Sequence, residues 1–160
     1  MFSIHEIINI AIQIEENGES FYRQALEIPS DTELEALLQW LADEELRHRE
    51  CFLKMRADFK RETGDGLLDH LSGTILQAAI GDHAFSLEEV DFSSIAKESE
   101  LIETALGFER DSITFYELVQ SLVEDPMILA HLDKIIKEEQ NHVRLLQEHQ
   151  KAFGETVSVE

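Results

Sequence analysis

The sequence predicts an all-α protein built as a four-helix bundle. Only two prolines, Pro29 and Pro126, interrupt the 160 residues, of which 43% are hydrophobic. The long stretches between them repeat apolar residues at helical spacing. One pattern of residues also occurs twice along the chain at a fixed offset. We therefore expect two antiparallel helix hairpins, joined by a long crossover that contains a short helix.

The first predicted hairpin covers residues 3–63. An apolar stripe predicts its first helix, which ends at Pro29. Ser30 is the predicted N-cap of the second helix, because Glu33 three residues later would complete a capping box. The second helix carries apolar residues at alternating steps of four and three and ends at the breaker run 63–66.

The second predicted hairpin covers residues 93–153 and follows a crossover over 64–92. Apolar residues from 67 to 79 predict the short helix within that crossover. In the second hairpin, Asp125 is the predicted N-cap of the last helix, with Pro126 at its first position. The chain length suits one domain, which we expect over 1–153, with a frayed tail over 154–160.

Composition narrows the classes of function. The formal net charge of −21 comes from 34 acidic and 13 basic residues. Such a surface repels nucleic acid and anionic lipid and attracts cations. We see no apolar run of membrane-spanning length and no signal-peptide pattern, so we expect no membrane association. The lone Cys51 excludes a disulfide scaffold and a thiolate metal site, which favours a reducing cytoplasm.

The repeated pattern is a Glu seven residues before a Tyr, followed later by Glu-x-x-His. Each member recurs 94 positions on (109−15, 116−22, 139−45, 142−48). The glutamates and histidines lie within apolar helical stripes, at similar distances from the turn of each hairpin. They should therefore converge at one level of the bundle. The repeated pairs are Glu15/Glu109, Tyr22/Tyr116, Glu45/Glu139 and His48/His142.

Four carboxylates and two imidazoles at one level of a core predict a site for two metal ions. Buried carboxylates without partners are very costly, and two divalent cations would balance four negative charges. One Glu from each of two helices, with Glu-x-x-His from the other two, is the ligand set of di-iron and di-manganese carboxylate bundles. Iron, manganese and zinc all suit these ligands. The competing interpretation is a set of polar core residues that pair among themselves.

Two assignments stay open from the residues alone. Glu44 precedes His48 by four positions, and Glu138 precedes His142 by four, so these glutamates could also face the metals. The Glu-x-x-His template favours their neighbours at 45 and 139. For Tyr22 and Tyr116, packing in the core competes with hydrogen bonding to the ligands.

The chain resembles the rubrerythrin group of the ferritin-like superfamily. The resemblance rests on the stretches IEENGESFY (14–22), DEELRH (43–48) and KEEQNH (137–142). It implies a di-iron centre and a ferritin-like four-helix bundle. It further implies that Glu15 and Glu109 are terminal ligands, that Glu45 and Glu139 bridge the metals, that His48 and His142 each bind one ion, and that Tyr22 and Tyr116 are hydrogen-bond partners of the ligands.

Two features depart from rubrerythrins proper. Those proteins carry a further Glu three residues after the ligand at 109, used in a redox-linked ligand exchange, where this chain has Ser112. The four cysteines of a rubredoxin domain have no counterpart in these residues. The pattern therefore predicts a nearly symmetric di-metal centre.

We draw three functional hypotheses from the pattern and the resemblance. The first is a non-haem di-iron oxidoreductase that reduces H₂O₂ or O₂ with electrons from an external donor. The second is an iron-binding or storage protein with ferroxidase chemistry, and the third is a metal-stabilised bundle without turnover. We also expect a homo-oligomer, with a dimer favoured.

Overall fold

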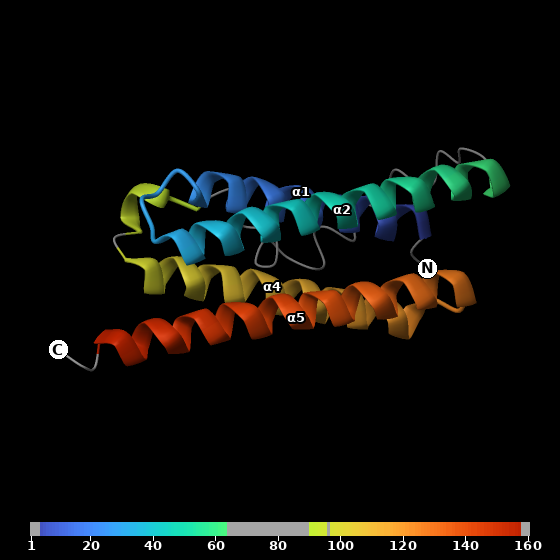
Figure 1. The fold of residues 1–160 in the computed structure, drawn as a ribbon. Coiled ribbons are helices and arrows are strands. Elements are labelled where there is room, and N and C mark those ends of the chain that lie inside the picture. Colours follow the sequence, from blue (N-terminus) through green and yellow to red (C-terminus); the bar gives the residue numbers. More distant parts are fainter. Residues whose placement is uncertain (1–3, 64–89, 96, 158–160) are drawn as a thin grey trace. The chain divides into compact units, whose positions relative to one another are not determined.

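The computed structural model describes residues 4–63, 90–95 and 97–157, and the part of the chain that it describes contains helices and no strand. Four long helices confirm the predicted all-α, four-helix fold class (Figure 1). A short 3₁₀ helix precedes the third of them. The elements are α1 (Ile4–Ala25), α2 (Thr32–Thr63), η2 (Phe92–Ser94), α4 (Glu98–Leu122) and α5 (Pro126–Val157). The short helix predicted over 67–79 lies outside the described residues.

The described residues belong to two compact units. One contains α1 and α2 from Leu37 onward; the other contains the turn Ile28–Ala36 with η2, α4 and α5. The second predicted hairpin lies in one unit, whereas the first is divided, since its turn, Ile28–Ala36, belongs to the unit of α4 and α5. Within the part of the chain that is described, no helix is long and apolar enough to cross a membrane.

Side-chain contacts show that α1 and α2 run antiparallel. Near the turn between them, Arg23 Nη2 donates to Asp43 Oδ1 at 2.9 Å. Further from the turn, Arg49 Nη1 lies 2.9 Å from Glu19 Oε2. The contact that is earlier in α1 is therefore later in α2, which is the arrangement of an antiparallel hairpin.

The hairpin of α4 and α5 begins its second helix where the sequence predicts. Asp125 Oδ1 accepts hydrogen bonds from the backbone N–H groups of Met127, at 2.9 Å, and Ile128, at 3.1 Å. These bonds satisfy donors that a helix N-terminus leaves without intrahelical partners. The cap therefore fixes the start of α5 at Pro126, and through it the register of α5 against α4.

Four boundaries differ from the prediction. The first helix, α1, ends at Ala25, before the predicted stop at Pro29. The cap of α2 is Asp31, not Ser30, because the Asp31 carboxylate accepts from the Leu34 N–H at 2.7 Å. The third long helix begins at Glu98 rather than near 93, because the Asp91 side chain caps the separate η2 turn. At the other end, α5 continues through Gly154 to Val157, beyond the predicted boundary at 153.

Large apolar side chains are fully buried in both hairpins. Burying a Leu, Ile or Phe side chain contributes roughly 1.5–3 kcal/mol, and this burial offsets the cost of the polar groups placed among them. The buried face of α1 is wider than its predicted stripe, since Ile7, Ile10 and Phe21 are buried as well. The fully buried apolar residues include Ile14, Phe21, Tyr22, Leu38, Leu41, Phe52, Leu101, Ile102, Leu106, Tyr116 and Leu146.

Candidate metal centre

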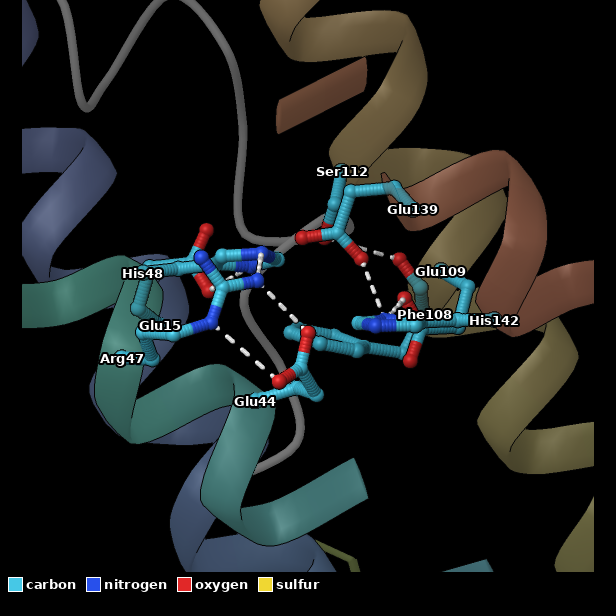
Figure 2. A network of polar contacts seen from close by, with 9 residues as sticks. All are labelled: Glu15, Glu44, Arg47, His48, Phe108, Glu109, Ser112, Glu139 and His142. Atoms are coloured by element: carbon cyan, nitrogen blue, oxygen red, sulfur yellow. Dashed lines mark hydrogen bonds and ion pairs between the residues drawn. The ribbon is translucent and has the colours of Figure 1, made fainter. Parts of the chain in front are cut away.

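The first hairpin brings Glu15, Glu45 and His48 together. One potential ligand atom from each lies within 4.8 Å of the other two. The Nδ1 atom of His48 is 3.4 Å from Oε2 of Glu15, on the neighbouring helix (Figure 2). All three residues are at most 1% exposed. We call these three residues half-site 1.

The second hairpin repeats this arrangement with Glu109, Glu139 and His142, which we call half-site 2. Their potential ligand atoms also lie within 4.8 Å of one another. His142 Nδ1 lies 3.5 Å from Glu109 Oε2 on α4 and 2.9 Å from Glu139 Oε2, one turn back on α5 (Figure 2). Residues three apart share a helical face, which explains the closer of these contacts. These residues too are at most 1% exposed.

The two half-sites share one geometry as well as one sequence pattern. In each, a histidine directs Nδ1 at the glutamate of the partner helix, at 3.4 Å and 3.5 Å. This leaves Nδ1, rather than Nε2, as the ring atom placed beside the carboxylates. The repeat in the sequence therefore corresponds to a repeat in side-chain placement.

Burial and neighbouring charge alter the acidity of half-site 2. Burial, with the nearby charge of Glu139, raises the pKa of Glu109 from 4.5 to about 8, although His142 opposes the change. Burial lowers the pKa of His142, but the charge and hydrogen bonds of Glu109 and Glu139 outweigh it and raise that pKa from 6.5 to about 10. Metal-free, this half-site holds protons at neutral pH, and a metal ion would have to displace them.

The donor set fits a divalent first-row metal. Each half-site offers two carboxylates and one imidazole, which suit Fe(II), Mn(II) and Zn(II). Placed in an apolar core without a cation, two carboxylates in one half-site would repel each other, as the raised pKa of Glu109 records.

The rubrerythrin family model matches residues 6–150. The chain belongs to the rubrerythrin family. Searches of curated proteins and of solved structures gave no match. Family membership and the buried Glu–His groups together support a di-metal, ferritin-like protein.

Glu44 lies at the flank of half-site 1 and is held by Arg47. The guanidinium donates to the Glu44 carboxylate through Nε at 3.2 Å and Nη2 at 2.6 Å (Figure 2). The Glu44 side chain is 19% exposed, whereas Glu45 is 1% exposed. Arg47 Nη2 also lies 3.5 Å from Nε2 of His48, on the ring edge opposite Glu15. Burial is thus greater at Glu45, the residue that the Glu-x-x-His template favours, but a Glu44 carboxylate oxygen also lies within 4.8 Å of a His48 ring nitrogen. The assignment of Glu45 as the ligand stays a prediction.

Ser112 is buried beside half-site 2, at the position where rubrerythrins proper carry a further glutamate. Its hydroxyl donates to the backbone carbonyl of Phe108 at 3.0 Å, one turn back on α4 (Figure 2). A hydroxyl engaged with its own helix backbone offers no carboxylate for exchange between two ligand positions. Half-site 2 consequently matches half-site 1 in its number of carboxylates.

Tyr22 and Tyr116 are completely buried, and each contacts the phenylalanine that precedes it. The ring centroids of Phe21 and Tyr22 are 5.3 Å apart in an edge-to-face arrangement, and those of Phe115 and Tyr116 are 5.6 Å apart. Packing of this kind stabilises the core. Hydrogen bonding from the tyrosine hydroxyls to the glutamates stays a prediction.

Two buried polar residues of α1 were not identified from the sequence. Glu6 is 2% exposed and Asn17 is 4% exposed. Asn17 Oδ1 accepts from Gln13 Nε2 at 2.8 Å, one turn back. Glu6 has an identical mate at the 94-residue offset, Glu100, whereas Asn17 is matched by Asp111; both Glu6 and Asn17 lie beside the predicted stripe. Only the greater width of the buried face of α1 accounts for their burial.

Proposed function

We propose that half-sites 1 and 2 together hold a pair of iron ions, and that this chain reduces H₂O₂ or O₂ with electrons from an external donor. The repeated, buried placement of a histidine Nδ1 beside a partner-helix glutamate, at 3.4 Å and 3.5 Å, carries the proposal. Membership of the rubrerythrin family supports iron over manganese or zinc.

Each ligand has a distinct role in the proposal. Glu15 and Glu109 would be the terminal ligands and Glu45 and Glu139 the shared ones, while His48 and His142 would each hold one ion through the Nδ1 atom that faces the carboxylates. When bound, the iron pair supplies the electrons that reduce the oxidant. Four carboxylates balance the charge of two divalent ions. The ions would thereby offset both the burial and the repulsion from Glu139 that raise the pKa of Glu109 in the metal-free chain.

The surrounding residues exclude water and hold the ligands in place. Buried apolar side chains such as Ile14 and Leu106 keep the carboxylates away from bulk solvent. In this proposal the hydroxyls of Tyr22 and Tyr116 donate hydrogen bonds to the terminal glutamates and fix their orientation. Such bonds to ligating carboxylates commonly tune affinity and activity.

Iron binding and storage with ferroxidase chemistry is the second candidate. The Ser112 hydroxyl, bonded to the Phe108 carbonyl, favours it, because the chain lacks the extra carboxylate that accompanies ligand exchange in rubrerythrins proper. Turnover separates the two candidates. A reductase consumes H₂O₂ over many cycles when a chemical reductant is supplied, whereas a storage protein oxidises Fe(II) and retains many irons per oligomer.

The ligand assignment is tested by counting iron in matched variants. Anaerobic Fe(II) titration of Glu45→Gln/Glu139→Gln should show two fewer ions per chain than Glu44→Gln/Glu138→Gln. The second pair removes the same charge from the adjacent positions, of which Glu44 faces Arg47 instead. If both double variants retain equal iron, the assignment is wrong.

A further inference from the structure

A third group of metal-ligating side chains lies in the unit that contains α4 and α5. It consists of Asp31, which caps α2; Glu98, the first residue of α4; and His149 on α5. One potential ligand atom from each lies within 4.8 Å of the other two. Asp31 matches Asp125 in the 94-residue repeat, as both cap a helix, but Glu98 and His149 have no like residue at that offset. We call these three residues the Asp31 cluster.

The spacing within the Asp31 cluster suits a shared ion better than direct contacts. Ligands bound at about 2.0–2.2 Å from one ion lie about 3–4.4 Å apart. Among the described residues, His149 makes no ion pair within 4.0 Å with either carboxylate, although all three ligand atoms meet within 4.8 Å. Between these three described residues, the direct hydrogen bond runs from the Asp31 backbone N–H to Glu98 Oε1, at 3.4 Å.

Two atoms of the Asp31 cluster point to a missing ligand. Glu98 Oε2 and His149 Nε2 are both shut off from solvent, and neither has a hydrogen-bond partner in the described part of the chain. Leaving such a buried atom without a partner is unfavourable, because it has lost its hydrogen bonds to water. The positive ends of α2 and α4 explain why carboxylates sit at Asp31 and Glu98, but they give no partner to the imidazole.

We propose that the Asp31 cluster binds one divalent first-row cation, separate from the di-metal centre. The donors are two carboxylate oxygens and one imidazole nitrogen, a set that Zn(II), Mn(II) and Fe(II) accept. Their charge of −2 balances that of the ion. Asp31 is exposed, so water completes the coordination and the ion exchanges with solvent. The ion would join three separate segments: the turn after α1, the start of α4 and the later part of α5.

Zinc counting on the full chain tests this site. After equilibrium dialysis against Zn²⁺, Glu98→Gln/His149→Gln should bind one ion fewer than the unmodified chain. The matched control Glu100→Gln/His131→Gln changes the same residue types on the same two helices and should lose none. Equal zinc in the two double variants would overturn the proposal.

Two further comparisons isolate the Asp31 cluster from the di-metal centre. In a Glu45→Gln/Glu139→Gln background, one zinc should remain, and adding His149→Gln should remove it. Asp31→Asn should weaken the remaining zinc about tenfold while preserving the α2 cap, because Asn caps helices as well as Asp does. Retention of that zinc in the His149→Gln background would count against the site.

A measurement on the unmodified chain covers the case in which a variant fails to fold. Paramagnetic Co²⁺ bound by the Asp31 cluster should broaden the ring-proton NMR signals of His149, while those of His131 stay sharp. Sharp His149 signals at saturating Co²⁺ would refute the proposal without any substitution.

Discussion

His48 Nδ1 lies 3.4 Å from Glu15 Oε2, across two helices of the first hairpin. The second hairpin places His142 at 3.5 Å from Glu109 in the same way. Each hairpin thus carries its own buried set of two carboxylates and an imidazole. Because the two sets have the same geometry, we expect each half-site to bind one metal ion.

His48→Gln and His142→Gln should each remove one metal ion relative to the unmodified chain. Each substitution takes away the single imidazole of one half-site and leaves the other intact. Metal analysis after Fe(II) or Zn²⁺ loading provides the count, with His131→Gln as the control. Loss of no ion in either variant, or of both ions in only one, would contradict equal half-sites.

The stability of the metal-free chain should fall as pH rises. The pKa values of Glu109 and His142 are both higher folded than unfolded, so the folded chain binds more protons. Their stabilising contribution is present below pH 4.5 and 6.5 respectively, and is lost as pH passes through about 8 and about 10. Melting temperature in chelator at pH 5, 7 and 9 measures this loss.

A matched variant separates this effect from general charge repulsion. Glu109→Gln/His142→Gln lacks both titrating groups, so its melting temperature should fall less over the same pH range. Bound metal should also reduce the slope, since it replaces the protons. If melting temperature falls equally with pH in the unmodified chain and in the variant, both in chelator, half-site 2 does not cause the loss of stability.

Arg47→Asn should raise the metal affinity of half-site 1 by roughly two- to fivefold, the effect of a screened charge near the surface. The Arg47 guanidinium lies 3.5 Å from His48 Nε2, so its positive charge opposes a cation on the same imidazole. The repeat places Asn141 at the equivalent position (141−94 = 47), so the variant gives both half-sites the same neighbour. Titration calorimetry compares it with Arg49→Asn, which removes an arginine paired to Glu19 instead. Equal affinities in the two variants would rule out this influence.

Tyr22→Phe and Tyr116→Phe should leave the iron count unchanged but lower the rate of peroxide reduction about tenfold. Removal of a buried hydroxyl costs about 1 kcal/mol, which corresponds to a melting-temperature change of roughly 2–4 °C. Phe21→Leu is the packing control, because it disturbs the ring that contacts Tyr22 and keeps the hydroxyl. Wild-type rates in both tyrosine variants would favour the core-packing interpretation.

Sequence periodicity predicts the fold class and the six buried half-site residues because both depend on which helical face is apolar. Helix ends are less predictable where several capping residues adjoin. Ser30 and Asp31 are both good caps, and only the position of the Leu34 N–H decides for Asp31. At 125 a single candidate precedes a proline, and there the prediction is confirmed.

Sequence could not identify features that depend on contacts between distant segments. Asp31 and Glu98 are 67 positions apart, and His149 follows Glu98 by 51 (149−98), so no motif joins them. The template favours Glu45 over Glu44 from the sequence alone, but the ion pair of Glu44 with Arg47 and the difference in their burial are seen in the structure alone. The sequence of one helix shows which of its faces is apolar. Which residues of different helices lie close together is known only from the three-dimensional structure.

The matching geometry of the hairpins also bears on how such a chain could arise. One hairpin already carries two buried carboxylates and one imidazole, so two identical hairpin chains associating as a homodimer would supply all six proposed ligands. Duplication and fusion of one short gene would then give the present arrangement without inventing a ligand. The two copies would since have diverged at some equivalent positions, for example where Asn141 corresponds to Arg47 and Ser112 corresponds to Gly18.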